Sequence, residues 1–298
     1  MSSQKIKKII TKTIDLHLHI GPEIIPRKYN VRQLIEQEKG KISGFCLKNH
    51  FYPTTPFIKE VKNKKGLKLI GSVTLNNFSG GLNPESIYAT KLISKDPIMV
   101  WFPTVNASNF LEKIKYETPW EWVQKKNFKA RPQGLVKKIK ILDKKKRLTK
   151  STIKILETIK KYNCILATSH ISWQESEKLV KKALKIGIDK IIVTHPIYQP
   201  INMPIKIQKE LASLGAFIEQ CYSMYSIDKV PIEKIAKQIK TIGAKYCILS
   251  SDVGQKFSPS PSQALKISAK LLLKNGITIK ELETMLVDNP RKIIKTPS

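Results

Sequence analysis

Short apolar runs that end in histidine or aspartate recur along this chain, and they constrain its fold more than any other feature. Near-continuous apolar runs suit strands that are buried on both faces, as in a parallel sheet. Segments of helical periodicity follow the runs, which gives eight strand–helix units. The runs that end in a titratable residue are 44–50, 164–170, 190–195 and 246–252, and they end in His50, His170, His195 and Asp252.

Eight strands that alternate with helices predict an α/β fold of the (β/α)8 TIM-barrel class. An open doubly wound sheet is the alternative, but no Gly-x-Gly-x-x-Gly motif follows the first strand. We expect residues 1–298 to form a single barrel domain, because this length suits one large α/β core. The order breaks at residues 104–150, a long insertion after the fourth strand with a predicted hairpin at 139–146. Such insertions form a lid or pocket wall, or else only decorate the surface.

The strongest local motif lies on the first strand, residues 13–20, where two histidines stand two positions apart. Alternation along this strand predicts its apolar residues on one face and Asp15, His17 and His19 on the other. Side chains two apart on a strand point the same way, so both imidazoles can bind one metal ion. Asp15 lies one pleat deeper on that face and is expected to be a partner of the ligands. Two histidines in a polar cleft without a metal are the alternative interpretation.

The formal net charge of the chain is +31, and almost all of it comes from lysine. Basic proteins can bind nucleic acid through release of counterions. We favour instead a compositional bias towards Lys and Ile, with the lysines on solvated helix faces, because no basic cluster is interleaved with aromatic residues. Nucleic acid is therefore an unexpected partner, although the sequence does not exclude it. The positive field would attract an anionic small-molecule substrate.

The four cysteines are far apart and form no Cys-x-x-Cys motif. We expect buried, reduced thiols in a cytoplasmic protein. The first residues lack the apolar core of a signal peptide, and no run is long and apolar enough to span a membrane. A homo-oligomer is compatible with the sequence, which does not specify the number of subunits.

Taken in strand order, the candidate residues resemble the metal site of the amidohydrolase superfamily. His17 and His19 lie on the first strand, His170 and His195 end the fifth and sixth strands, and Asp252 ends the eighth. More narrowly, the chain is similar to a poorly characterised, DUF6282-like branch of these barrels. Nearly the whole chain takes part in the resemblance, through residues 15–22, 193–196, 215–219, 248–255 and 288–290.

This resemblance implies an enzyme that binds one or two divalent metal ions, with Zn²⁺ expected first. His17 and His19 would hold the first metal, while His170 and His195 would hold a second metal or orient the substrate. Asp252 would contact the metal and act as the general base, later passing the proton to the leaving group.

The fourth strand departs from the superfamily pattern. Residues 100–104 are Val-Trp-Phe-Pro-Thr and lack the lysine or glutamate that bridges two metals in these enzymes. Lys48, on the face of the second strand that carries His50, is a catalytic candidate that would replace this bridge or bind an anionic substrate group. His50, Glu219 and Tyr198 are candidate substrate-binding residues, and Glu219 is also a possible metal ligand.

The function we expect is hydrolysis of a C–N or C–O bond by metal-activated water, with an amide, cyclic amide, lactone or ester as the substrate. A phosphodiesterase or nuclease is one alternative, because related barrels with a similar His-x-His start cleave DNA. A metal-dependent decarboxylase is the other. The fold alone does not choose among these reactions, because one barrel shape supports many chemistries.

Overall fold

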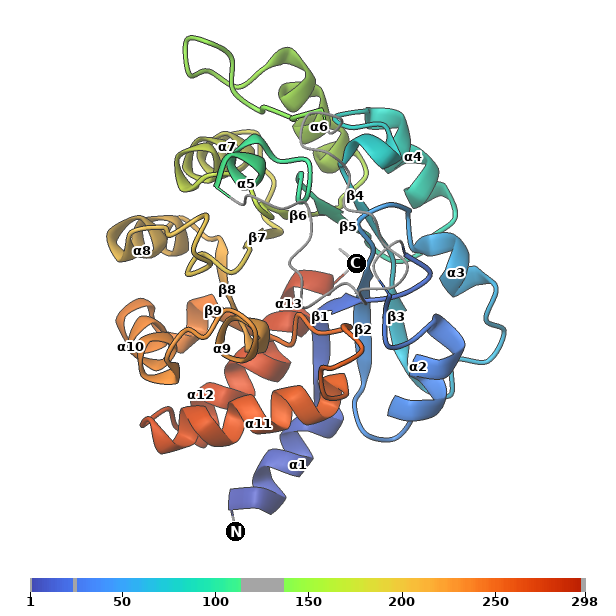
Figure 1. The fold of residues 1–298 in the computed structure, drawn as a ribbon, viewed down its shortest axis with the longest axis vertical. Helices are drawn as coiled ribbons and strands as arrows, with labels where there is room; N and C mark the ends of the chain where they lie inside the picture. Colours follow the sequence, from blue (N-terminus) through green and yellow to red (C-terminus); the bar gives the residue numbers. More distant parts are fainter. Residues whose placement is uncertain (1, 24–25, 114–136, 296–298) are drawn as a thin grey trace.

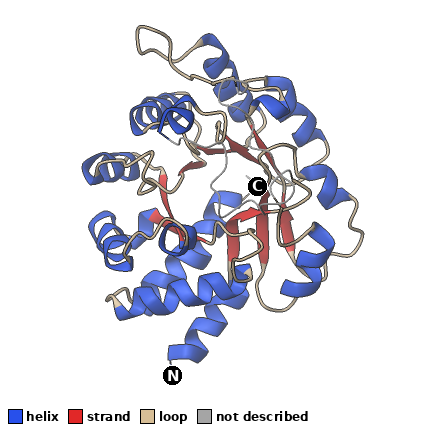
Figure 2. Ribbon diagram, in the orientation of Figure 1, coloured by secondary structure: helices blue, strands red, loops and turns tan. Residues whose placement is uncertain are grey.

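The computed structural model is a barrel of short parallel strands enclosed by helices (Figures 1 and 2). It describes residues 2–23, 26–113 and 137–295. Neighbouring strands pair in parallel and follow chain order, which confirms the predicted TIM-barrel class. The strands are β1 (Ile14–His19), β2 (Gly44–Lys48), β3 (Lys68–Ile70), β4 (Ser72–Thr74), β5 (Met99–Trp101), β6 (Ile165–Ala167), β7 (Ile191–Val193), β8 (Phe217–Cys221) and β9 (Cys247–Ser250).

The third strand of the barrel is divided at Gly71 into β3, which pairs with β2, and β4, which pairs with β5. A Cβ atom at Gly71 would meet Thr55 Oγ1 at 2.5 Å, so only glycine fits between this strand and the helix beside it. The Met99 amide donates to Gly71 O at 3.0 Å, which continues the pairing across the division. With β3 and β4 taken as one strand, the barrel has the eight strand positions that the sequence predicts.

The chain that follows β9 returns to β1. Leu18 and Val253 form a parallel bridge, the His19 amide donates to Val253 O at 2.8 Å, and the Asp252 amide donates to His17 O at 2.8 Å. A Cβ atom at Gly254 would lie 2.3 Å from His19 O, so this close approach requires glycine. The first and last strands therefore present their carboxyl ends side by side.

The helices lie outside the strands. The sequence favours Asn30 as a helix cap and Ser172 with Glu175 as a capping box, and in the structure both Asn30 and Ser172 form capping boxes. The helices are α1 (Ser2–Lys12), α2 (Val31–Glu38), α3 (Thr55–Lys59), α4 (Pro84–Leu92), α5 (Ser108–Lys113), α6 (Lys150–Lys161), α7 (Trp173–Lys185), α8 (Ile205–Ser213), α9 (Tyr222–Ser226), α10 (Ile232–Ile242), α11 (Pro261–Lys274), α12 (Ile279–Glu283) and α13 (Asn289–Ile294).

Two predicted helices differ from the structure. The sequence favours a helix from residues 54–56 that is closed by Gly66, but α3 ends at Lys59. It also favours one helix over 278–294, which a π-helical segment, Thr284–Asp288, divides. The helix α1, which the sequence analysis did not identify, precedes the barrel and buries Ile6, Ile9 and Ile10.

A β-bulge in β1 overturns the prediction that Asp15 shares a face with the histidines. Asp15 pairs with Phe45, but Leu18 pairs with Leu47, so β1 holds one extra residue between these positions. Leu16 consequently packs with the apolar side chains inside the barrel, whereas Leu18 packs in the outer core. Asp15 is a partner of the site through the backbone, since its Oδ1 accepts from the amides of His17 and Ser251.

The inner core fills the barrel on the amino-terminal side of the histidines. It is small and almost wholly aliphatic, with Trp101 as its largest member, while a larger core lies between the strands and the helices. Because the interior is packed with side chains, polar groups that face inward gather only at the carboxyl ends of the strands. The inner core contains Ile14, Leu16, Cys46, Ile70, Met99, Trp101, Ile165, Ala167, Ile192, Phe217, Ile248, Ile293 and Ile294.

The insertion after β5 is described at both of its ends. It begins with α5, and the predicted hairpin at 139–146 is present as an antiparallel bridge between Leu142 and Leu148 around a turn at Asp143. Residues 114–136, which include the Trp-Glu-Trp and Arg-Pro motifs of the insertion, lie outside the described residues. Among the helices that are described, none combines the length and apolar character needed to cross a membrane.

Candidate metal site

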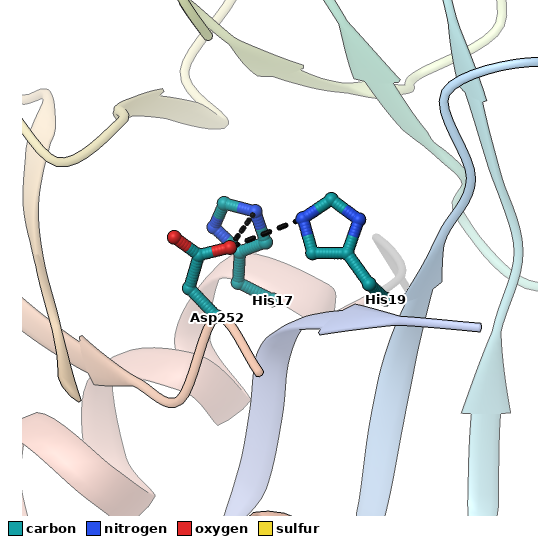
Figure 3. A group of neighbouring side chains, drawn as sticks. All are labelled: His17, His19 and Asp252. Carbon is teal, nitrogen blue, oxygen red and sulfur yellow. Dashed lines mark hydrogen bonds and ion pairs between the residues drawn. The ribbon is translucent and has the colours of Figure 1, made fainter. Parts of the chain in front are cut away.

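His17, His19 and Asp252 converge at the carboxyl ends of β1 and β9 (Figure 3). His17 Nε2 lies 3.0 Å from Asp252 Oδ1, and His19 Nε2 lies 3.1 Å from the same oxygen. All three side chains are buried. Two imidazole nitrogens and one carboxylate oxygen that meet in this way are a donor set suited to a divalent metal ion. The bulge in β1 supports this geometry, because it turns both histidines inward above Leu16.

Glu219 on β8 orients His17. Its Oε2 lies 3.1 Å from His17 Nδ1, the ring nitrogen opposite the one that faces Asp252. A carboxylate in this position fixes the tautomer and orientation of a metal-binding imidazole. The thiol of Cys221 lies 3.9 Å from the same nitrogen. Glu219, which the sequence analysis placed among the substrate-binding candidates, therefore lies behind His17, and it does not line the cavity described below.

Lys48 at the end of β2 reaches the same imidazole from the other side. Its Nζ lies 2.9 Å from His17 Nε2 and 4.4 Å from the centre of the Trp101 ring, and the side chain is fully buried. A cationic group therefore faces the same nitrogen as the Asp252 carboxylate. This position in the site fits the sequence expectation of a functional lysine better than a role in the apolar core.

Asp252 is held by the strand end and by α9. Its backbone φ of 50° lies in the left-handed region, which is uncommon for residues other than glycine and marks a constrained position. Ser223 donates its hydroxyl to Asp252 Oδ2 at 2.6 Å. One carboxylate oxygen is therefore fixed by Ser223 while the other faces His17 and His19.

The remaining histidines form one group with the first two. The ring of His195 lies 5.8 Å from that of His17 and 5.2 Å from that of His170, and the ring of His50 lies 4.7 Å from that of His19. Tyr198 packs 5.4 Å from His170 and 5.3 Å from His195. His50 Nδ1 forms a hydrogen bond with Thr104 Oγ1, with the two atoms 2.8 Å apart. All the histidines that the sequence analysis singled out thus lie around one point.

A cavity of about 30 Å³ opens at this group and is bounded by His19, His50, His170, His195, Tyr198 and Asp252, together with residues from α9 and the loop after β9. Helix α5, at the start of the insertion, packs beside it. Asn109 donates to His170 O at 3.2 Å, and the Phe110 ring lies 5.1 Å from the His170 ring. The described start of the insertion is therefore adjacent to the cavity, as a pocket wall would be.

Burial determines the protonation state of these histidines. It lowers the pKa of His19, His50 and His170 well below the ordinary value and lowers that of His195 to about 4. The four imidazoles are therefore neutral near pH 7, which is the state in which a ring nitrogen can bind a metal.

The carboxylates and Lys48 respond to burial differently. Burial, the largest single influence, would raise the pKa of Asp252 and of Glu219, but the neighbouring histidines, His17 first among them, together lower both pKa values below the ordinary value. Burial lowers the pKa of Lys48, although Asp252 and Glu219 oppose the shift. Two ionised carboxylates and one destabilised ammonium group therefore surround His17.

Sequence reasoning missed several residues at this site. Glu23 and Arg27 lie in the loop after β1, while Cys221 and Ser223 lie at the end of β8 and the start of α9. Glu23 Oε1 accepts from the His50 amide at 2.6 Å. Their position directly after a barrel strand was the available indication, since loops at the carboxyl ends of strands build barrel sites.

Comparison with known proteins agrees with this architecture. Residues 12–219 match the profile of a family of unknown function, DUF6282. No curated protein matches the sequence.

Among solved structures, a probable dipeptidase from Pseudomonas aeruginosa superposes with a TM-score of 0.63 at 9% identity, over 98% of this chain and 96% of the other. An amidohydrolase from Pseudomonas aeruginosa gives 0.60 at 11% identity, over 97% and 98% of the two chains. The phosphotriesterase homology protein from Escherichia coli gives 0.59 at 13% identity, over 96% and 99%. The chain therefore belongs to the family DUF6282 and has the fold of the amidohydrolase superfamily.

Proposed function

We propose that this protein is a metal-dependent hydrolase that uses metal-activated water to cleave a C–N or C–O bond in a small substrate. One observation carries the proposal: His17 Nε2 and His19 Nε2 lie 3.0 and 3.1 Å from the same oxygen, Asp252 Oδ1, at the carboxyl ends of adjacent strands. Buried polar atoms normally have partners, and such a convergence of acceptors is stabilised when a cation joins them.

The surrounding residues fit a divalent metal. Two imidazoles of the group, those of His170 and His195, each keep a buried Nδ1 with no hydrogen-bond partner in the described structure. Neutral imidazoles and a carboxylate are preferred ligands of Zn²⁺, which is our first choice of metal. His17, His19 and Asp252 would hold it, and His170 and His195 are the candidates for a second ion or for substrate orientation.

A bound zinc ion supplies a water with a lowered pKa, close to 7. The chain itself supplies the proton transfers and the positioning. Asp252 is ionised, and its carboxylate would accept a proton as the general base while Ser223 holds Oδ2. Glu219 orients His17 through Nδ1. His195, His170, His50 and Tyr198 line the cavity and would contact the substrate, while the buried charge of Lys48 would attract an anionic group.

A single metal ion is the simpler arrangement here. The end of β5 and the residues after it, 101–104, offer no carboxylate between the histidines. Lys48 occupies the neighbourhood of His17 Nε2 instead. We propose that Lys48 either acts on the substrate or takes the place of the residue that bridges two metals. Zinc titration of Lys48→Met separates these two roles.

The scissile bond is open to a direct test. The similar structures include proteins titled dipeptidase, amidohydrolase and phosphotriesterase homology protein, the last with phosphate in its active site. A panel of nitrophenyl carboxylate esters, lactones, dipeptides and nitrophenyl phosphate esters would identify the class. Phosphoester hydrolysis is the second candidate, supported by that phosphate and by the net charge of +31. Release of carbon dioxide without hydrolysis would indicate a decarboxylase.

The decisive experiment measures the metal content of purified protein by elemental analysis, for the wild type, His17→Ala and Asp252→Ala. Exposed Asp189→Ala, at the other end of the barrel before β7, is the matched control. We expect about one divalent metal per chain in the wild type and the control, and loss of the metal in both site variants. Absence of metal from the wild type after loading with Zn²⁺, Mn²⁺ and Fe²⁺ would overturn the proposal.

A further inference from the structure

Arg27 is a buried cation with two unused donor groups. Its side chain is 1% exposed, and its Nε donates to Glu23 Oε2. Its Nη1 and Nη2 are buried and donate to no atom in the described structure. Burying a charged group whose donors have no partner costs free energy. A guanidinium group stays charged at any pH that a protein tolerates, so Arg27 cannot avoid this cost by losing a proton. An acceptor for these two nitrogens is therefore required.

The guanidinium group lies beside the candidate metal site. The backbone of Arg27 pairs with that of Gln255, and the Lys28 amide donates to Gly254 O at 2.7 Å, so this loop is fixed against the chain that follows Asp252. Gln255, His19 and His50 all line the cavity. The charge of Arg27 is close enough to contribute to the lowered pKa of both His19 and His50.

These neighbours favour an anion rather than a second cation. His19, Glu23 and His50 bring one donor atom each within 4.8 Å of one another, which by itself would resemble a cation site. Both oxygens of Glu23 are already used, one by Arg27 and the other by the His50 amide. The guanidinium group would also repel a cation placed there. The unpaired guanidinium nitrogens are donors, and His19 Nδ1, which carries the proton when Nε2 binds a metal, has no partner among the described residues either.

We infer that Arg27 Nη1 and Nη2 form an oxyanion subsite next to the metal site and that the substrate carries a carboxylate or phosphoryl group that binds there. That the anion belongs to a substrate rests on the proposed function. Two parallel N–H groups match two oxygens of such a group, and Glu23 takes only the Nε donor of the fork. The anionic group would also explain why a cation is retained in a buried position.

Isothermal titration calorimetry with succinate, succinamide and inorganic phosphate tests the subsite on the full chain, both as purified and after chelator treatment. An anion held by Arg27 remains bound after the metal is removed, whereas an anion held only by the metal does not. We expect succinate or phosphate to bind and neutral succinamide not to bind. Preference between succinate and phosphate then separates a carboxylate substrate from a phosphoryl substrate.

Two variants of the same ion pair give opposite expectations. Arg27→Lys keeps the charge but loses the fork, and it should raise the dissociation constant of the anion about tenfold, the loss of one charged hydrogen bond. Glu23→Gln removes the negative charge beside the subsite and should lower that constant. The control is Arg32→Lys at an exposed position on α2, which should leave the dissociation constant of the anion unchanged.

Damage to the fold would weaken binding in both buried variants, so tighter binding in Glu23→Gln supports the subsite even if Arg27→Lys does not fold. Unchanged or weaker binding in a Glu23→Gln protein that unfolds at the same temperature as the wild type, or failure of both anions to bind the wild type, would overturn it. Metal content measured on the same samples separates the two ideas. A wild-type protein that contains metal but binds neither anion would overturn only the subsite. A wild-type protein that binds an anion but takes up no metal would overturn only the hydrolase proposal.

Discussion

Lys48 Nζ and His17 Nε2 lie 2.9 Å apart in the fully buried centre of the site. The same nitrogen of His17 lies 3.0 Å from Asp252 Oδ1. An ammonium group and a divalent cation repel each other at this range, particularly where water is excluded. Lys48 and a metal on His17 are therefore in competition, unless the lysine is neutral and acts as a ligand.

Lys48→Met should tighten metal binding about tenfold while lowering kcat/KM, because it removes a competing charge and a contact to an anionic substrate. Zinc titration against a competing chelator measures the first effect. Lys190→Met is the matched control: Lys190 is also buried, and its Nζ has no hydrogen-bond partner within the described parts of the chain, but it precedes β7 at the opposite end of the barrel. Weaker metal binding in Lys48→Met would instead identify Lys48 as a ligand or a bridge.

Ser223→Ala should weaken metal binding by roughly tenfold to a hundredfold, the usual effect of removing a residue that orients a ligand. The hydroxyl of Ser223 donates to Asp252 Oδ2 at 2.6 Å, and without it the carboxylate can rotate away from His17 and His19. The same titration measures the change. Ser258→Ala, which removes a hydroxyl bonded to Gln255, controls for loss of a buried serine near the site and should leave metal affinity unchanged. An unaltered affinity in Ser223→Ala would show that Asp252 is held by its backbone alone.

Glu219→Gln should also weaken metal binding, because the amide loses the charge that stabilises the proton on His17 Nδ1. We expect a drop within the same range of tenfold to a hundredfold. The neighbouring Gln220 is buried, and both polar atoms of its side chain lack partners among the described residues. Gln220→Met is therefore the control for the effect of altering β8 itself. Metal affinity equal to that of the wild type in Glu219→Gln would reassign Glu219 to the substrate or to the fold.

The eight strand positions, the main helix caps and the location of the histidines were all predictable from the sequence. Apolar runs and caps are local patterns, and the carboxyl ends of parallel strands must share one end of the barrel. The side chain of Asp15 could not be placed, because a β-bulge adds one residue to β1 and reverses the alternation between Leu16 and His17. Such a bulge is a property of the pairing with β2 rather than of β1 alone.

The partners of the histidines were also beyond sequence reasoning. Arg27 and Ser223 have no motif around them, and their importance comes from the charge of Arg27 near His19 and the hydrogen bond of Ser223 to Asp252, which only the folded barrel creates. Glu219 was a candidate as a carboxylate on the seventh barrel strand, but its contact with His17 Nδ1 joins β8 to β1, two strands that are not paired with each other. The type of each site residue and its approximate place in the fold are therefore encoded in the local sequence, whereas its role in the site depends on the tertiary geometry.

His195 should make stability of the metal-free protein fall as the pH drops from about 6.5 to about 4. Burial lowers the pKa of folded His195 to about 4, while an unfolded histidine titrates near 6.5. Between these values the unfolded chain binds more protons, so acid favours unfolding, and the contribution is complete only above pH 6.5. The shift corresponds to about 3 kcal/mol at most. Urea unfolding of the wild type and His195→Gln at pH 4.5 and pH 7.5 measures it, and equal pH dependence in both would contradict the prediction.

Asp15 should have the opposite effect. Burial raises the pKa of folded Asp15 to about 7, against an ordinary value of 3.8. Between these values the folded protein binds more protons than the unfolded chain, so stability falls as the pH rises, by about 4 kcal/mol at most. In Asp15→Asn the side-chain oxygen can still accept from the amides of His17 and Ser251, and its amide can face the Ser251 hydroxyl. Asp15→Asn should therefore gain stability relative to the wild type as the pH rises from 4 to 8. A constant difference in unfolding free energy between the two proteins over this range would show that the Asp15 carboxyl group is ionised throughout.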